Sequence, residues 1–174
     1  MTIYFLRHAN AGQKRMDPVR DEKRALDKQG ISQSRAVGRL LAALDVQIDA
    51  LFASGLKRAS QTASLVGNEL AFEGRVNFVP ALRPEGTFAQ FKLLLQENMQ
   101  HDALMVVGHN PNFSEFLSLL LTNGKVKSLI NLPKGGVAKV EIERKKAAVL
   151  KWCITPKVVE TLQMSSASSS APNI

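Results

Sequence analysis

The sequence predicts an α/β fold: a three-layer α/β/α sandwich with a mostly parallel central sheet and an antiparallel C-terminal hairpin. Short apolar runs alternate with longer segments of helical periodicity along most of the chain, which is typical of a parallel sheet covered by helices on both faces. Two later runs, residues 137–142 and 148–154, are separated only by a short basic stretch from Arg144 to Lys146. This spacing predicts the hairpin.

Each predicted element follows from its own apolar spacing. Asp27 or Ser32 is a candidate N-cap of the first helix, and Asn110 is a candidate N-cap of the last, with Pro111 at its first helical position. The elements before the hairpin are, in order, a strand at 3–6, a helix through Val37 and Leu44, a strand at 49–53, a helix through Ala59 and Leu70, a strand at 76–79, a helix through Phe88 and Leu95, a strand at 104–107 and a helix through Phe113 and Leu120.

Length and composition limit the class of protein. A chain of 174 residues can bury a core without a disulfide or a metal, and we expect one domain over residues 1–157. Residues 158–174 are serine-rich, and we expect this tail to be mobile or loosely docked.

The single cysteine, Cys153, lies in an alternating run that predicts a core thiol, so a disulfide framework is excluded. With no leader-like or bilayer-length apolar segment, we expect a cytoplasmic protein without a membrane partner.

The formal net charge of +8 points to an anionic partner. Nucleic acid is not that partner, because the basic residues are spread along the chain without interleaved aromatic residues or a recognition-helix pattern. For most of the lysines we expect a solvated surface. The cluster from Lys14 to Lys28 differs, because it directly follows a histidine that is a candidate for catalysis.

Three predicted strands lead into residues that bind oxyanions. Arg7 and His8 follow the first strand, Arg58 begins the helix after the second, and Gly108-His109 ends the run at 104–107. The carboxyl ends of parallel strands meet at one edge of a sheet, where ligands bind. A cation at a helix N-terminus costs about 0.3–1 kcal/mol, and a bound phosphate would offset this cost. Taken alone, Arg58 could instead pair with a surface carboxylate.

These residue types fit phosphoryl transfer to an imidazole. His8 would supply a neutral ring nitrogen, while Arg7, Arg58 and a protonated His109 would stabilise the equatorial oxygens. Zinc is the competing chemistry, but no ligand set with zinc spacing surrounds either histidine, so we expect no metal. For the leaving-group acid, Glu85 is the first candidate, and a loop-capping role for it has equal weight. Asp17 and Asp21 follow it as candidates.

Several segments resemble the histidine phosphatase superfamily, which has the phosphoglycerate mutase-like fold. They are Arg7-His8-Ala9, residues 54–62 and Gly108-His109-Asn110-Pro111, and the stretch 24–30 is similar to that of SixA-type phosphohistidine phosphatases. The resemblance covers the chain to about Ile154. It implies that His8 is the phosphorylated nucleophile, that Arg7, Arg58 and His109 bind the phosphate, and that no metal or organic cofactor takes part. The chain departs from the SixA pattern at Asn10, commonly acidic there, and at Ala25, usually proline.

We therefore expect a phosphatase that removes phosphate from phosphohistidine or another phosphorylated side chain of a protein, such as a histidine phosphotransfer domain. The short segment between Arg58 and His109 has no room for an inserted cap, so the pocket should be open. Two alternatives remain. One is a phosphomonoesterase for a small metabolite, such as a sugar phosphate or nucleotide. The other is a non-enzymatic phosphate-binding module, which would leave His8 without a role. The sequence does not predict the natural substrate or the oligomeric state.

Overall fold

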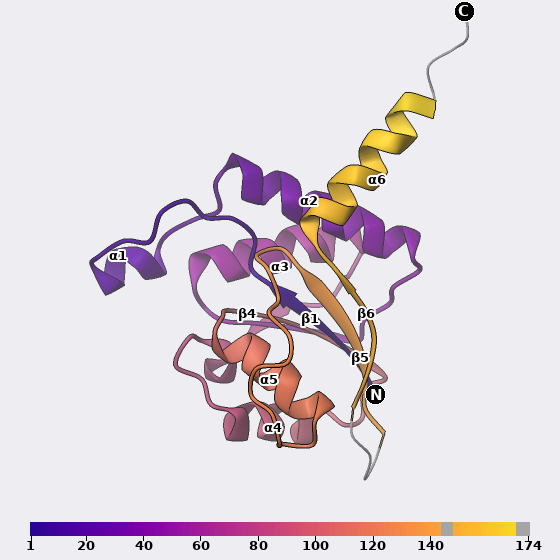
Figure 1. The fold of residues 1–174 in the computed structure, drawn as a ribbon. Helices are drawn as coiled ribbons and strands as arrows, with labels where there is room; N and C mark the ends of the chain where they lie inside the picture. Colours follow the sequence, from indigo (N-terminus) through magenta and orange to yellow (C-terminus); the bar gives the residue numbers. More distant parts are fainter. Residues whose placement is uncertain (144–147, 170–174) are drawn as a thin grey trace, which may run out of the picture.

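The computed structural model describes residues 1–143 and 148–169, and a six-stranded sheet lies between two layers of helices (Figure 1). This confirms the predicted fold class. The strand order is β3-β2-β4-β1-β5-β6. The first four strands along the chain run parallel, β5 is antiparallel to β1, and β6 is antiparallel to β5. The strands are β1 (Thr2–Arg7), β2 (Ala50–Ala53), β3 (Val76–Phe78), β4 (Ala103–Gly108), β5 (Val137–Glu141) and β6 (Val149–Ile154).

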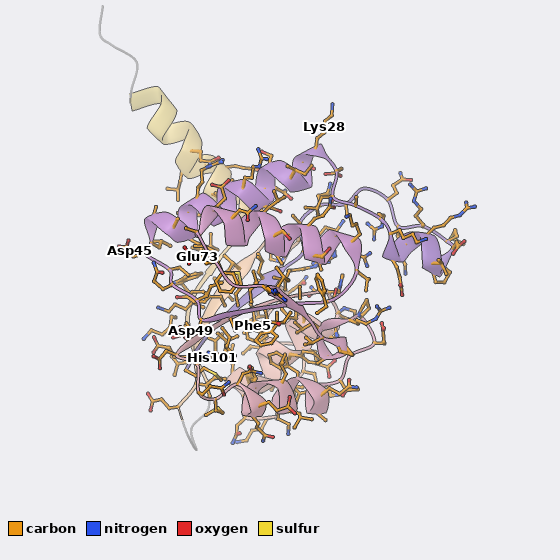
Figure 2. The ribbon with its side chains drawn as sticks, turned by 180° about the vertical axis from the view of Figure 1, so that it is seen from behind. Phe5, Lys28, Asp45, Asp49, Glu73 and His101 are labelled. Carbon is orange, nitrogen blue, oxygen red and sulfur yellow. The ribbon has the colours of Figure 1, made fainter. Side chains whose placement is uncertain are left out.

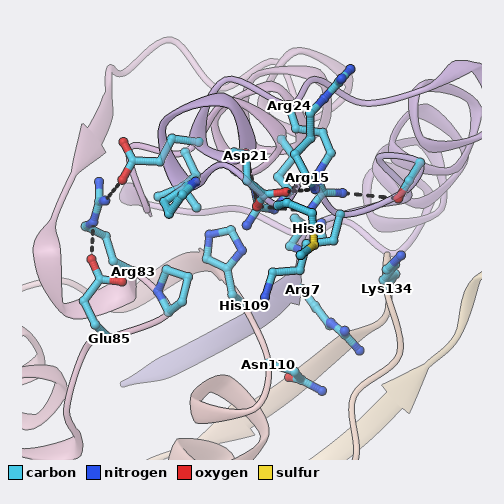
Figure 3. Close-up of a pocket in the computed structure, with 18 residues that line it drawn as sticks. Arg7, His8, Arg15, Asp21, Arg24, Arg83, Glu85, His109, Asn110 and Lys134 are labelled. Atoms are coloured by element: carbon cyan, nitrogen blue, oxygen red, sulfur yellow. Dashed lines mark hydrogen bonds and ion pairs between the residues drawn. The ribbon is translucent and has the colours of Figure 1, made fainter.

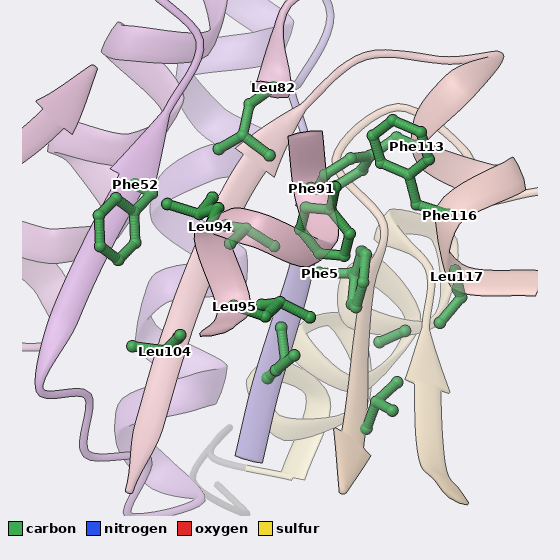
Figure 4. Packing of buried hydrophobic residues seen from close by; sticks show 14 of the residues in the cluster. Phe5, Phe52, Leu82, Phe91, Leu94, Leu95, Leu104, Phe113, Phe116 and Leu117 are labelled. Carbon is green, nitrogen blue, oxygen red and sulfur yellow. The ribbon is translucent and has the colours of Figure 1, made fainter. Parts of the chain in front are cut away.

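Helices cover both faces of the sheet. On one face α2 (Lys28–Ala43) packs against α3 (Lys57–Glu69), and on the other lie α4 (Phe88–Glu97) and α5 (Asn112–Leu121) (Figure 1). Strand β1 is buried on both sides because alternate side chains enter different clusters: Ile3 and Phe5 face α4 and α5, whereas Tyr4 and Leu6 face α2 and α3. Figure 4 shows Phe5 among the aromatic rings of the first cluster.

Polar residues lie at the edge of the sheet formed by the amino ends of β2 and β4, away from the catalytic candidates at the carboxyl ends. Asp49, just before β2, accepts hydrogen bonds from the backbone N–H groups of Asp102 and Ala103, at 2.8 Å each. His101 lies at this edge near Asp49 (Figure 2). His101 therefore does not join the two histidines at the carboxyl edge.

Three short or terminal helices were not predicted. Helix α1 (Pro18–Glu22) and the 3-10 helix η1 (Pro80–Leu82) lie in segments whose sequence has no helical periodicity. Helix α6 (Pro156–Ser169) occupies most of the stretch expected to be a loose tail. Val159 of α6 is buried in the cluster with α2, so packing continues beyond residue 157. Residues 170–174 of the expected tail lie outside the described residues, and its mobility stays a prediction.

Two local predictions were wrong. Helix α5 begins at Asn112 with Pro111 as its N-cap residue, and the Asn110 side-chain oxygen accepts from the Ser114 hydroxyl at 2.8 Å instead of from a backbone N–H of the helix. Cys153 is exposed, because β6 is an edge strand whose outward side chains face solvent. The turn predicted from Arg144 to Lys146 lies outside the described residues.

In the parts of the chain that the structure describes, no helix has the length and apolar character needed to cross a membrane.

Candidate active site

The carboxyl edge of the sheet brings the two histidines together. Strand β1 pairs with β4 so that Arg7 lies opposite Gly108, and the next residues are His8 and His109. The two imidazole centroids are 4.8 Å apart, and the His8 backbone N–H donates to Gly108 O at 3.1 Å. Arg58, in the first turn of α3, lines the same cavity of about 490 Å³ as Arg7 and both histidines. Figure 3 shows this cavity with the two rings near its centre.

His8 presents one ring nitrogen as a free base. Its Nδ1 lies 2.8 Å from the carbonyl oxygen of Ala9, and a carbonyl can only accept, so Nδ1 bears the proton. Burial is the main cause that lowers the pKa of His8 to about 3; the Ala9 hydrogen bond opposes this shift, and the charges of Arg58, Arg7 and Lys134 add to it. At neutral pH the ring is uncharged, and its Nε2 lone pair is available for attack on phosphorus.

His109 is also buried, and burial favours its neutral form. Its Nε2 lies 2.5 Å from the Ser54 hydroxyl, and its Nδ1 is buried without a hydrogen-bond partner. Burial lowers the pKa of His109 to about 2, with added effects from His8, Arg58 and Arg7. This lowered pKa speaks against a protonated His109 in the protein by itself, and a protonated His109 beside a bound phosphoryl group stays a prediction. When Ser54 donates to Nε2, the neutral ring still offers one N–H donor at Nδ1.

Three buried nitrogen atoms of the cavity lack an acceptor. Of the four buried side-chain polar atoms without a partner in the described residues, three are Arg7 Nε, Arg58 Nε and His109 Nδ1. A buried polar group left unpaired costs about 1–3 kcal/mol, so this arrangement is costly unless an acceptor joins it. All three residues line the cavity, and an oxyanion is the kind of acceptor that such nitrogen donors bind.

Asp21 fixes one side of the cavity. Its carboxylate accepts from Arg24 Nε at 2.8 Å and from the Arg15 backbone N–H at 2.9 Å, and it lies 3.3 Å from Arg58 Nη1. The hydrogen bond from Arg24 holds the pKa of Asp21 down to about 2, despite burial. An ionised, doubly paired carboxylate is a poor proton donor, so Asp21 positions Arg58 instead. Asp17 caps α1 and does not line the cavity.

The stretch 24–30 supports the loop that follows His8. Arg24 Nη1 donates to the carbonyl oxygen of Ala11 at 3.0 Å. Asp27 caps α2, and its Oδ2 accepts from Asn10 Nδ2 at 2.7 Å and from the Gly12 backbone N–H at 2.9 Å. At Gly30 an added Cβ would lie 1.9 Å from the Asn10 carbonyl oxygen. The first turn of α2 therefore packs directly on the backbone two residues beyond the nucleophile candidate.

Glu85 lines the cavity as an ionised partner of Arg83. Arg83 Nε donates to Glu85 Oε1 at 2.5 Å, and Arg83 Nη2 also pairs with Glu22. The Arg83 hydrogen bond lowers the pKa of Glu85, whereas a general acid needs a raised one. The acid role of Glu85 stays a prediction, and its pairing with Arg83 speaks against it.

Lys134 is a cavity residue that the sequence analysis did not identify. It lines the cavity, and its Nζ donates to Asn10 Oδ1 at 3.2 Å. The next residue, Gly135, has φ +69° and donates its backbone N–H to the carbonyl oxygens of Arg7 and His8, at 3.0 and 3.1 Å. The sequence signal was a lysine before two glycines that lead into β5.

In the described residues, no group of three or more His, Cys, Asp or Glu could hold a metal ion.

Comparisons with known proteins agree with this geometry. The family model of the histidine phosphatase superfamily, branch 1, matches residues 3–85. An uncharacterised protein of Picosynechococcus sp. is 31% identical over 140 residues, covering 79% of this chain and 82% of that protein. The phosphohistidine phosphatase SixA of Escherichia coli is 25% identical over 158 residues, covering 90% of this chain and 94% of its own.

Solved structures show the same fold. A structure of the protein histidine phosphatase SixA complexed with tungstate matches with a TM-score of 0.79 at 23% identity, covering 90% of this chain and 98% of that chain. The α-ribazole phosphatase of Shigella flexneri matches with a TM-score of 0.73 at 17% identity, covering 90% and 97%.

Proposed function

Because the chain belongs to the histidine phosphatase superfamily, we propose that it hydrolyses phosphorylated protein side chains, above all phosphohistidine, through a phosphorylated His8. The observation that supports this most strongly is the set of three unpaired, buried nitrogen atoms on Arg7, Arg58 and His109, beside the free Nε2 of His8. A phosphoryl group bound to these donors has its phosphorus next to a neutral nucleophile.

The reaction proceeds in two displacements. In the first, the substrate is a phosphohistidine whose ring is already protonated on its other nitrogen. The His8 Nε2 lone pair attacks phosphorus, the P–N bond of the substrate breaks, and the ring departs as neutral imidazole with the bonding electrons. The Ala9 carbonyl accepts from Nδ1–H and stabilises the positive charge that develops on the ring. In the second, water attacks the phosphorus of the phosphohistidine, and inorganic phosphate leaves while Nε2 regains its lone pair. The two arginines stabilise the charge on the equatorial oxygens throughout.

Proton supply favours phosphohistidine as the substrate. The carboxyl groups of Asp21 and Glu85 both have lowered pKa values because arginines pair with them. An alkyl phosphate ester needs a strong proton donor for its leaving oxygen. The P–N bond of phosphohistidine cleaves readily once its own ring is protonated, so it does not need such a donor. No inserted cap separates α3 from β4, and the open pocket suits a side chain presented by another protein, such as a histidine phosphotransfer domain.

A small-molecule phosphatase is the second candidate. The structural match to the α-ribazole phosphatase of Shigella flexneri is nearly as long as the match to SixA, and a cavity of about 490 Å³ lies within the size range of small-ligand sites. Fold similarity at this low identity does not establish a substrate. The absence of a poised acid on Asp21 or Glu85 counts against an ester of this kind.

A substrate panel separates the two candidates. The purified protein is incubated with phosphohistidine peptides, phosphoserine peptides, sugar phosphates, a nucleotide and α-ribazole phosphate, and released phosphate is measured. The proposal expects the highest kcat/KM for phosphohistidine. Efficient turnover of one metabolite, together with weak turnover of every phosphopeptide, would move the small-molecule phosphatase into first place.

A further inference from the structure

The cavity has more positive charge than one phosphoryl group requires. Each of its three carboxylates is already paired with an arginine in the structure: Asp21, Glu22 and Glu85. Other cations line the cavity with no carboxylate partner in residues 1–143 and 148–169: Arg7, Lys14, Arg15 and Lys134. A phosphoryl dianion neutralises only part of this charge.

Lys134 has a fixed position among these cations. Lys14 and Arg15 are exposed on the loop before α1, where solvent and salt screen their charges. Lys134 is half-buried, and the backbone on either side of it is attached to β1. Gly135 donates to Arg7 O and His8 O, and the Arg7 backbone N–H donates to Gly136 O at 3.0 Å. The backbone at Lys134 is therefore fixed next to β1, and the Lys134 ammonium group is near enough to His8 for its charge to lower the pKa of His8.

Asn10 holds Lys134 without neutralising it. The Asn10 Nδ2 donates to Asp27 Oδ2 at 2.7 Å and to Gln29 Oε1 at 3.1 Å, so its Oδ1 must face the Lys134 Nζ, 3.2 Å away. An amide oxygen orients the ammonium group but leaves its full charge. A carboxylate at position 10 would cancel that charge and would also face the carboxylate of Asp27.

Lys134 also lies away from the leaving-group acid candidate. In Figure 3, Arg83 and Glu85 are on one side of the two histidines and Lys134 is on the other. The Arg83 side is already balanced by Glu22 and Glu85. Away from the exposed loop before α1, the cavity's cations without a carboxylate partner in the described residues are Arg7 and Lys134, on the side formed by β1 and the loop before β5.

We infer that Lys134 forms a second anion-binding subsite, and that the preferred substrate has a negatively charged group next to its phosphoryl group. The source of that group rests on the proposed function: on a phosphoprotein it is an acidic side chain adjacent to the phosphohistidine. A carboxylate or second phosphate on a small molecule has the same chemistry, and the experiments below distinguish the two sources.

The first experiment tests the subsite without assuming a substrate. Methylphosphonate, phosphonoacetate and phosphonopropionate are tested as competitive inhibitors of aryl phosphate hydrolysis. For each carboxylated phosphonate, the inhibition constant of methylphosphonate is divided by its own inhibition constant, and this ratio measures the advantage that the carboxylate gives. The native protein should bind at least one of the two carboxylated phosphonates more tightly than methylphosphonate. Lys134→Gln should reduce that advantage by on the order of fivefold, the value of a partly screened ion pair.

Two further variants control this measurement. Lys134→Arg keeps the charge and should keep most of the advantage. Lys125→Gln removes a lysine that is exposed and lines no cavity near the site, and it should leave both the ratio and the basal activity unchanged. The inference is overturned if neither carboxylated phosphonate has an advantage in the native protein, or if Lys134→Gln retains it.

The second experiment identifies the source of the charge. Phosphohistidine peptides with Glu or Gln beside the modified residue are compared as substrates. The native protein should prefer the Glu peptide through a lower KM, and Lys134→Gln should abolish the preference. If neither peptide is hydrolysed, the proposed protein substrate is wrong, while the phosphonate ratios still decide the role of Lys134. If both peptides are hydrolysed equally by the native protein, the acidic side chain is not the source and the inference fails for phosphoproteins.

Discussion

His8 and His109 are two buried, neutral histidines, and they make the fold sensitive to acid. Their pKa values are lowered to about 3 and about 2, against about 6.5 in an unfolded chain. Between these values the unfolded state binds protons that the folded state does not, so the free energy of unfolding falls as the pH decreases below about 6.5. By pH 5 we expect a loss of roughly 2 kcal/mol for each histidine. Urea unfolding at pH 7 and pH 5 measures this loss.

The variant His109→Gln is the matched comparison for that measurement. It removes one of the two depressed groups, so about half of the difference between pH 7 and pH 5 should disappear. Asp21, with a pKa of about 2, contributes stability that is lost only at still lower pH and does not enter this window. An identical pH dependence in both proteins would show that His109 is not held neutral by burial.

Glu85 can be tested as the leaving-group acid with a matched control. Glu85→Gln and Glu22→Gln each remove one carboxylate partner of Arg83. Because Glu85 is held ionised, we expect each variant to change kcat/KM for alkyl phosphates, aryl phosphates and phosphohistidine by a similar small factor. If Glu85 is the acid, Glu85→Gln alone should reduce alkyl ester hydrolysis on the order of a hundredfold, and our interpretation of its pairing would be wrong.

At the residue scale, the sequence could predict the four residues that lie at strand ends or in the helix turn after a strand, and it could not predict those whose positions depend on loop packing. Arg7, His8, Arg58 and His109 meet because three parallel strands end at one edge. The orientation of Lys134 depends on hydrogen bonds that join residues more than 120 positions apart. The neutral state of His109 depends on burial, which spacing does not reveal.

At the scale of elements, Gly30 tests how strongly α2 controls the site. Gly30→Ala would place a methyl group 1.9 Å from the Asn10 carbonyl oxygen, so the loop after His8 or the helix must move. We expect a lower melting temperature, with a loss of about 1–3 kcal/mol of stability from overpacking, and a lower kcat/KM for aryl phosphates. Gly55→Ala is the control, because nothing lies within 4 Å of its added Cβ, and it should melt like the native protein. Native activity in Gly30→Ala would contradict the role we give to α2.

Elements with clear periodicity were predictable, and those set by local hydrogen bonds were not. The strands at β1 and β4 and the helices α2 to α5 show their spacing in the sequence. Helix α1 has five residues and depends on the Asp17 cap and on Asp21, which pairs with Arg24 and Arg58. Helix α6 begins with apolar residues, of which Val159 is buried, and the serine content of the tail obscured this start.

At the scale of the whole molecule, the alternation of strands and helices predicted the layers, but not the order of strands within the sheet. That order places β1 between β4 and β5, and it depends on which crossover connections pack, not on the pattern of any single segment. The same order places the carboxyl ends of β1, β4 and β2 side by side. The cavity therefore follows from the topology and from residue types at three strand ends.

The net charge of +8 leads to a prediction about salt. Lys14, Arg15 and Arg20 are exposed on the loop and helix beside the cavity, so an acidic protein surface should be attracted to this side. We expect kcat/KM for a phosphoprotein to fall several-fold between 50 and 200 mM salt, while kcat/KM for an aryl phosphate changes little. A flat response for both substrates would contradict electrostatic attraction of a protein partner.

The central claim is that His8 becomes phosphorylated during turnover. The most direct test is to mix the protein with a ³²P-labelled substrate, quench within milliseconds and measure the label that stays on the protein. We expect label that is stable in base and labile in acid, located on His8, and absent from a folded His8→Ala variant that has also lost turnover. A His8→Ala protein that still hydrolyses substrate, or label found on another residue, would contradict it.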